Sequence, residues 1–368
     1  MGNSANKEAP PAAQTAQHES DAAAFDWGVA PDGPAEGELD NLDELVLQTW
    51  ASCKAKPVDA KLFRSDADEA TRRHEMHWRK RSSFIELDCG EDSFFVSNTY
   101  RSIAVADGVA GWRDEGVDPA HFPNELMKTA KLFTETHRGE RDPEVIMERA
   151  FGKVSADGVV KAGSSTFCIA SLVNGPDQTH YIDVANLGDG GCIVIRNHDI
   201  VYRVHEKVHG FNAPLQLSVL PEEYKGRCYA DSVQDAVRET FQVKNGDVII
   251  MGTDGLFDNR FCSQMAMEAG WVGATEKSVY EGIPFAGRVL KFVMGPRQRT
   301  QFADPYRVVQ RLCQDAYKTS MDKTAETPWS ESLKYLGVEH AEGGKVDDIT
   351  VLLSRVTTRG DLMDTTMW

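Results

Sequence analysis

Acidic residues adjoin short apolar runs at four places in this sequence. A single Asp-Gly pair is most often a turn, but strands can bring several carboxylates to one edge of a sheet, where their repulsion needs a compensating charge. Hard divalent cations such as Mg²⁺ and Mn²⁺ supply it through oxygen ligands, and the absence of nearby His or Cys disfavours zinc. The four places are Glu91-Asp92, Asp107-Gly108, Asp254-Gly255 and Asp347-Asp348.

The elements that would position these carboxylates are short runs rich in β-branched and aromatic residues, from residue 83 onward. Gly, Asn and Asp separate the runs, as turns between strands require. Helical periodicity appears over Asn124–His137, with Asn124 as the N-cap, and over Pro305–Ala316. The order of elements predicts an α+β layered domain rather than a βαβ wind. The predicted strands are 84–87, 94–96, 102–106, 166–172, 181–187, 192–196, 200–204, 248–251 and 351–353.

Six motifs together resemble the metal-dependent Ser/Thr protein phosphatases of the 2C type (the PPM family), in the family's order across roughly residues 83–356. The segments 112–119 and 209–217 resemble the T-cell-activation-type branch of that family. The resemblance implies a four-layer αββα sandwich of two antiparallel sheets flanked by helices, with two Mg²⁺ or Mn²⁺ ions at one end. The motifs are 89–92, 105–114, 163–166, 185–190, 253–259 and 345–351.

The resemblance also assigns roles to individual positions. Asp107 would bridge both metal ions, and the carbonyl of Gly108 would ligate the first. Asp254 and Asp347 would hold the second ion, and Asp189 matches a position that contributes to a weaker third one.

Glu91 and Asp92 would act through metal-bound waters in the same scheme. The implied reaction is hydrolysis of phosphoserine and phosphothreonine in phosphoproteins, in which the paired cations activate a water that attacks phosphorus in line. No cysteine needs to be a nucleophile. Asp92, Asp107, Asp254 and Asp347 are therefore the candidate catalytic residues.

Two departures from the family pattern bear on the chemistry. Many members have His directly after the Asp-Gly pair as a general-acid candidate, and here the residue is Val109. The loss of a general acid typically costs about 10²–10⁴-fold in rate, although the resembling branch also lacks it. The arginine that binds substrate phosphate is missing from its usual place, and Arg81, Arg101 and Arg113 are the alternatives.

Several conspicuous residues near the motifs have simpler structural explanations. Trp112 and Phe257 are expected to be packing residues, and 164–166 is expected to be a strand edge rather than a nucleophile site. His209 is expected to lie in the core or in a flap.

The net charge of −17 excludes a nucleic-acid binder that works through a basic footprint. Residues 1–44 hold ten acidic residues and one lysine, so we expect a disordered tail there. This tail is expected to be a solvated linker, with partner docking or autoinhibition at the metal site as the alternatives. We interpret 45–82 as an N-terminal extension with a short docking helix, 83–356 as the catalytic domain and 357–368 as a C-terminal tail.

The seven cysteines are odd in number and form no Cys-x-x-Cys pair, which indicates neither a zinc site nor a disulfide framework. A reducing compartment, and hence a cytoplasmic protein that is a monomer, is the expectation. Gly2 is a candidate for N-myristoylation, although Asn6 stands where the pattern has Ser or Thr. Association with a membrane is expected only if Gly2 is acylated, and an unmodified tail is the alternative.

Two other functions are alternatives to that of a protein phosphatase. A pseudophosphatase would keep the sandwich as a regulatory or scaffolding module, and another enzyme of the same class would hydrolyse a small phosphomolecule. The three clustered carboxylates Asp107, Asp254 and Asp347 argue against the first, because a fold without a metal has no use for them.

Overall fold

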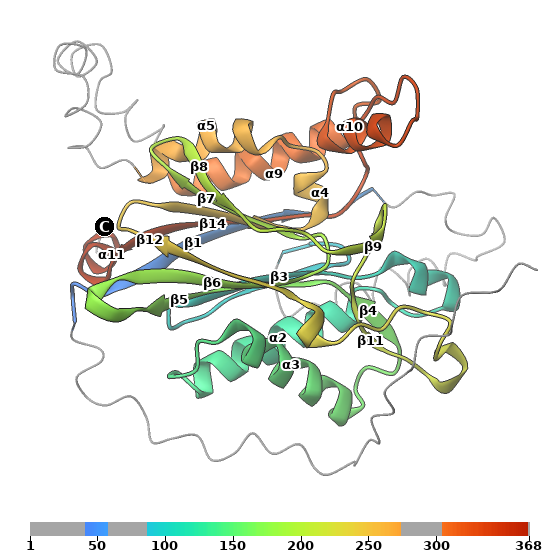
Figure 1. Ribbon diagram of the computed structural model, residues 1–368, viewed down its shortest axis with the longest axis horizontal. Helices are drawn as coiled ribbons and strands as arrows, with labels where there is room; N and C mark the ends of the chain where they lie inside the picture. Colours follow the sequence, from blue (N-terminus) through green and yellow to red (C-terminus); the bar gives the residue numbers. More distant parts are fainter. Residues whose placement is uncertain (1–40, 58–86, 274–303, 367–368) are drawn as a thin grey trace, which may run out of the picture.

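The computed structural model describes residues 41–57, 87–273 and 304–366, and every structural statement below concerns these residues. Two antiparallel five-stranded sheets lie face to face, and helices cover the outer face of each sheet (Figure 1). The predicted αββα sandwich is therefore confirmed.

The first sheet combines strands from both ends of the chain, in the order β1-β14-β13-β7-β8. Helices α5 (Cys262–Gly273) and α9 (Pro305–Met321) cover its outer face (Figure 1). Helix α9 begins at the predicted residue, where the side chain of Asp304 caps the amide of Tyr306. The strands are β1 (Leu45–Lys54), β14 (Ile349–Thr358), β13 (Val248–Gly252), β7 (Gly191–Arg196) and β8 (Asp199–Arg203).

The second sheet has the order β12-β6-β5-β3-β2, and helices α2 (His121–Thr136) and α3 (Pro143–Asp157) pack on its outer face (Figure 1). Helix α2 begins before the predicted Asn124 cap. Instead, the Asn124 side chain donates to the carbonyl of Ala120 at 2.7 Å from within the first turn. The strands are β12 (Val237–Val243), β6 (His180–Leu187), β5 (Phe167–Asn174), β3 (Ser102–Asp107) and β2 (Asp92–Val96).

The central layer of the core lies between the two sheets. Ile103, Val184, Ile249 and Leu352 come from four different strands, and each is fully buried there. A further apolar cluster fills the space under α2 and α3, and a third lies under α5 and α9. The middle strands are thus apolar on both faces, which makes them continuous hydrophobic runs.

The remaining elements are shorter. They are β4 (Gly163–Ser165), β9 (Val208–Gly210), β10 (Ala213–Pro214), β11 (Leu217–Val219), α4 (Asp254–Phe257), α10 (Pro328–Tyr335), α11 (Arg359–Thr366) and the 3₁₀ helices η1 (Ala110–Glu115), η2 (Pro176–Gln178), η3 (Glu222–Tyr224) and η4 (Val233–Asp235). Several of them, among them α4, α10, β4, β9 and β11, lie at one end of the sandwich (Figure 1).

The structure corrects the interpretation of both ends of the domain. Residues 45–54 form strand β1 instead of a docking helix, and β1 pairs along its whole length with β14. The folded unit therefore includes this part of the predicted extension. At the other end β14 continues to Thr358 and α11 follows it, so 357–366 is not a simple tail. Most of the predicted acidic tail, with Gly2, lies outside the described residues.

The expectation about cysteines is also wrong for one pair. Cys53 near the end of β1 and Cys89 just before β2 form a disulfide, although 36 residues separate them in sequence. The described residues also contain five free cysteines, of which Cys168, Cys192 and Cys313 are buried in apolar surroundings.

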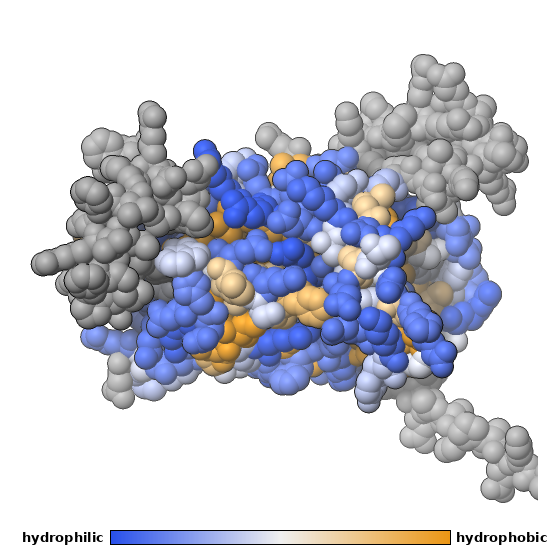
Figure 2. Space-filling view, turned by 90° about the horizontal axis from the view of Figure 1, so that it is seen from above, coloured by the Kyte–Doolittle hydropathy of each residue, from blue (hydrophilic) through white to orange (hydrophobic). Residues whose placement is uncertain are grey.

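The outer surface of the α5–α9 layer is mainly hydrophilic, with apolar residues in small separate groups (Figure 2). This fits the amphipathic pattern of α9, whose Val308, Val309 and Leu312 face the core. Among the described helices, none has the length and apolar character that a membrane crossing requires.

Candidate active site

Two carboxylates meet where β2 begins and β3 ends. These strands are antiparallel neighbours, and their register places Asp92 directly opposite Asp107. The hydroxyl of Thr253 donates to Asp92 Oδ2 at 2.8 Å, and so ties the first sheet to the second. The pairing of β2 with β3, the next strand along the chain, thus places two acidic side chains at the same end of the sandwich.

The other sheet brings two more acidic residues to this end. Strand β13 stops at Gly252, and Asp254 follows as the first residue of α4. Strand β14 starts at Ile349, directly after the Asp347-Asp348 pair. Because β13 and β14 are antiparallel neighbours, with Gly252 opposite Val351, the end of one and the start of the other share an edge.

A lysine links the carboxylates that come from β13 and β14. The ammonium group of Lys345 contacts Asp254, lies 3.0 Å from Asp258 Oδ2 and lies 3.2 Å from Asp347 Oδ2. Asn259 fixes the backbone of this lysine, because its amide donates to the Lys345 carbonyl and its oxygen accepts from the Lys345 amide. Only 15% of the lysine side chain is exposed.

A second lysine occupies the other side of the cluster. The ammonium group of Lys56, just beyond β1, lies 3.0 Å from Glu91 Oε2, 2.9 Å from Asp347 Oδ1 and 3.1 Å from Asp348 Oδ2. Asp347 therefore contacts both lysines, one through each of its oxygens.

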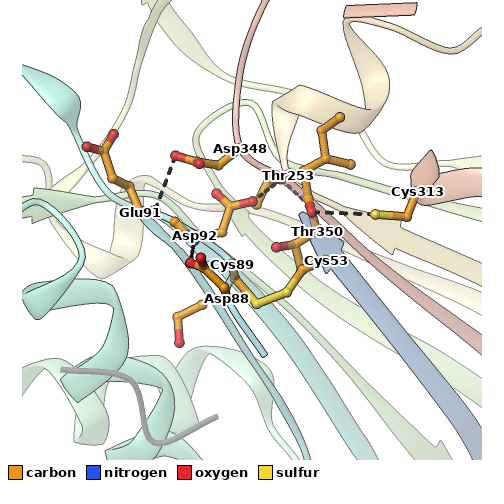
Figure 3. The surroundings of a disulfide bond; sticks show 12 residues. Cys53, Asp88, Cys89, Glu91, Asp92, Thr253, Cys313, Asp348 and Thr350 are labelled. Atoms are coloured by element: carbon orange, nitrogen blue, oxygen red, sulfur yellow. Dashed lines mark hydrogen bonds between the residues drawn. A yellow bond between two sulfur atoms is a disulfide. The ribbon is translucent and has the colours of Figure 1, made fainter. Parts of the chain in front are cut away.

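Asp348 holds the backbone of the site together. Its Oδ1 accepts from the amide of Lys56 at 2.8 Å. Its Oδ2 accepts from the amide of Glu91 at 3.1 Å (Figure 3). Gly90 makes this approach possible, because a Cβ at that position would lie 1.9 Å from Asp348 Oδ1 and its φ of +70° disfavours other residues. The two acid motifs are thus joined through one buried side chain.

The carboxylates at the strand ends resist ionisation. Burial raises the pKa of Asp107 well above its ordinary value, and the charges of Asp92 and Asp254 add to the shift. Burial also raises the pKa of Asp92, with a further contribution from Asp348. A cation placed between these groups would favour their ionised forms.

The lysines reverse this effect for one carboxylate. Burial would raise the pKa of Asp347, but the ammonium groups of Lys56 and Lys345 lower it below its ordinary value. For Asp258 the ammonium group of Lys345 does not outweigh the effect of burial. Burial and the charge of Asp254 raise the pKa of Asp258 to about 7.

The chemistry of the cluster fits divalent cations. The donors are buried carboxylates, and Asp254 Oδ1 accepts no hydrogen bond from the described residues. Asp189 belongs to the same electrostatic neighbourhood, since burial and the charge of Asp254 raise its pKa well above its ordinary value. No three ligand-type side chains among the described residues meet at one preformed metal position. The ammonium groups of Lys56 and Lys345 lie among these carboxylates.

The predicted site residues are therefore found together at one end of the sandwich. Glu91, Asp92 and Asp107 come from the second sheet, and Asp254 and Asp347 come from the first. Gly108 directly follows β3, and its amide donates to the carbonyl of Glu91 at 3.1 Å. The ligand roles of these residues stay predictions.

The structure separates the candidate phosphate-binding arginines. Arg101 is buried at the opposite end of β3 from Asp107, where it pairs with Glu44. Arg113 in η1 contacts Glu91 at the site, with 34% of its side chain exposed. Arg81 lies outside the described residues.

The structural explanations for the neighbouring residues are confirmed. Trp112 is buried and its indole donates to Ser164 Oγ at 2.9 Å, and the Thr166 hydroxyl accepts from the amide of Asp107. Phe257 packs against the core under α5 and α9. His209 lies in the β9–β10 flap, 2.9 Å from Asp231.

Sequence reasoning gave no role to four members of the cluster, namely Lys56, Lys345, Asp258 and Asp348, although it named Asp348 as part of an acidic pair. Lys345, Asp258 and Asp348 lie inside the motifs that carry the resemblance, and this could have marked them as candidate site residues. Lys56 had no such signal, because its place depends on the pairing of β1 with β14.

Known proteins resemble this chain in sequence and in fold. The family described as "Stage II sporulation protein E (SpoIIE)" matches residues 119–278. The X-ray structure of the photosystem II phosphatase PBCP is similar at a TM-score of 0.59 and 25% sequence identity, covering 84% of this chain and 99% of that one.

Relatives named "Protein phosphatase PTC7 homolog" extend the likeness over most of the domain. The one from Homo sapiens is 35% identical over 277 residues, which cover 74% of this chain and 81% of the relative. The one from Danio rerio is 33% identical over 276 residues, which cover 74% and 83%. The chain belongs to the PP2C-type (PPM) family of protein phosphatases. The predicted class, a metal-dependent Ser/Thr protein phosphatase, is confirmed.

Proposed function

We propose that the protein hydrolyses phosphoserine and phosphothreonine in phosphoproteins at the cluster of Asp107, Asp254 and Asp347. The convergence of these three carboxylates from β3, α4 and the approach to β14 carries the proposal. Two partly buried lysines contact these carboxylates, and a divalent cation bound among the same oxygens would supply positive charge in their place.

We carry the ligand assignment over from the resemblance to the family. Asp107 would bridge two Mg²⁺ or Mn²⁺ ions, with the Gly108 carbonyl on the first and with Asp254 and Asp347 on the second. When bound, the cations would supply Lewis-acid activation of water and positive charge for the phosphate. Asp189, beside Asp254, would contribute to a weaker third ion.

Residues around the proposed ligands orient the acid pair Glu91-Asp92. Thr253 holds one oxygen of Asp92, which leaves the other oxygen for a metal-bound water. Glu91, whose two oxygens contact Arg113 and Lys56, would also act through metal-bound water. We propose Arg113 as the residue that contacts the substrate phosphate, because it contacts Glu91 at the site and its side chain is partly exposed to solvent. A guanidinium group matches the geometry of a phosphate through paired donors.

Phosphopeptide turnover in Mn²⁺, with and without chelator, tests the proposal. We expect Asp254→Asn to reduce turnover by about 10²-fold or more. Asp157→Asn, in an exposed ion pair on α3, is the matched control and should keep full activity. Full activity in Asp254→Asn would refute the assignment.

The same assay separates the two competing functions. A pseudophosphatase would turn over no substrate at any Mn²⁺ concentration. A small-molecule phosphatase would hydrolyse p-nitrophenyl phosphate or a sugar phosphate but leave phosphopeptides intact. We expect phosphopeptides to be the better substrates.

We further propose that the chain belongs to the branch of the T-cell-activation-type phosphatases. The segments 112–119 and 209–217 support this, because both contribute to elements around the site: η1 and the β9–β10 flap. A cytoplasmic monomer, bound to a membrane only through an acylated Gly2, remains our prediction for the whole protein. Myristate-analogue labelling of wild type and Gly2→Ala tests the last point.

A further inference from the structure

The Cys53–Cys89 disulfide lies directly beneath the acidic cluster (Figure 3). It joins the end of β1 to the turn that leads into β2, and these segments belong to different sheets. Cys89 is buried, whereas Cys53 is partly exposed. The bond is therefore a covalent link between the two sheets at the end of the sandwich that holds the site.

Each cysteine of this disulfide lies two or three residues before residues of the site in the sequence. The carbonyl of Cys89 accepts from the amide of Asp92 at 3.2 Å, and Glu91 lies between them in sequence. On the other side, Cys53 precedes Lys56 by three residues, and the amide of Ala55 donates to the carbonyl of Asp88 at 3.2 Å. The disulfide thus fixes the segment carrying Lys56 against the turn carrying the acid pair.

We infer that Cys53–Cys89 is a thiol–disulfide exchange site whose oxidation state sets how firmly the turn 88–92 is held, and through it the affinity of the site for divalent cations. The inference rests on the proposed function, because it assumes that Glu91 and Asp92 serve bound cations. The co-reactant is a dithiol reductant, either a small dithiol or a protein with a redox-active cysteine pair.

The exchange balances as a two-electron reaction. A thiolate of the reductant attacks the sulfur of Cys53, the more exposed of the two, and the S–S bond breaks with Cys89 as the leaving thiolate. The second thiol of the reductant then attacks the mixed disulfide and releases Cys53. The reductant ends as a disulfide, and the two cysteines end as thiols that have gained two electrons and two protons.

Reduction of the disulfide is expected to loosen the turn 88–92. The amides of Lys56 and Glu91 can still donate to the Asp348 carboxylate, but the covalent link between the two backbone segments is gone. Organising Glu91 and Asp92 around a cation then costs additional chain entropy. Loss of a group that supports metal ligands typically lowers metal affinity by about 10–100-fold, and we expect about tenfold here.

The test uses the full chain with Cys228→Ser as background, because Cys228 is an exposed free cysteine whose oxidation would complicate the result. One sample is oxidised with glutathione disulfide and a second is reduced with dithiothreitol, and both are freed of reagent by gel filtration under nitrogen. Differential alkylation with mass spectrometry reports the state of Cys53 and Cys89, and calorimetry measures Mn²⁺ binding.

We expect the oxidised sample to bind Mn²⁺ about tenfold more tightly than the reduced one, and reoxidation to restore the affinity. The double variant Cys53→Ser/Cys89→Ser should match the reduced protein and ignore both reagents. Circular dichroism shows whether that variant folds, and the reversible change in the Cys228→Ser protein decides the question if it does not.

The outcomes separate the inference from the proposed function. Equal Mn²⁺ affinity in the two redox states, or free thiols at Cys53 and Cys89 after oxidation, would overturn the inference and leave the proposed function standing. No Mn²⁺ binding in either state would overturn both.

Discussion

Replacement of Lys345 by methionine removes the positive charge that Asp254, Asp258 and Asp347 share. Only 15% of the lysine side chain is exposed, so water cannot screen the three carboxylates effectively. Loss of one partner from a buried ion pair costs about 3–5 kcal/mol. For a domain of this size each kcal/mol lowers the melting temperature by about 2–4 °C, so we expect a fall of about 10 °C in the presence of chelator.

Mn²⁺ should largely cancel this loss. A divalent cation among the same carboxylates replaces the missing charge, and the ammonium group no longer competes with it. The assay is thermal unfolding of wild type and Lys345→Met, each with chelator and with saturating Mn²⁺. Lys225→Met, which removes an exposed pair with Glu222, is the control and should change the melting temperature little.

Two results would refute this reasoning. If Lys345→Met is as stable as wild type in chelator, the lysine does not balance the cluster. If the loss is the same with Mn²⁺, the cation does not take the place of the ammonium charge.

Three further predictions concern the same site. In chelator, stability should decrease as the pH rises from about 4 to 7, because the pKa of Asp258 is raised from 3.8 to about 7 and the folded protein keeps a proton that the unfolded chain has lost; thermal unfolding across this range checks it, and Mn²⁺ should abolish the decrease. Gly90→Ala should destabilise the protein by about 1–3 kcal/mol, since its φ is +70° and its Cβ would collide with Asp348; a denaturant titration equal to that of wild type would contradict this. Arg113→Ala should raise KM for a phosphopeptide more than it lowers kcat, whereas an unchanged KM would exclude Arg113 from phosphate binding.

Local patterns in the sequence predict the strands, an α+β layered domain and the acidic residues at the strand ends, whereas the four-layer sandwich was implied by the resemblance to the family. The runs before Asp107 and Asp254 are apolar strands in the structure as expected, and their ends coincide with the acidic residues. Pairing of the sequence neighbours β2 and β3 then places Asp92 opposite Asp107, whereas the acids of β13 and β14 meet through the pairing of strands that are distant in sequence.

Features that depend on distant contacts could not be predicted in this way. Strand β1 has apolar residues that also suit a helix, and only its pairing with β14 decides the conformation. The disulfide follows from that pairing, since it places Cys53 beside the turn of Cys89. The position of Lys56 has the same origin, because only the fold shows that it balances carboxylates from two segments.

The central claim is that the carboxylates at the end of the sandwich form a metal centre. Calorimetric titration of Mn²⁺ into wild type and Asp107→Asn, with Asp157→Asn as the control, tests it most directly. We predict that wild type and the control bind Mn²⁺ alike, at more than one ion per chain, and that Asp107→Asn loses most of this binding. Equal binding by all three proteins would contradict the account.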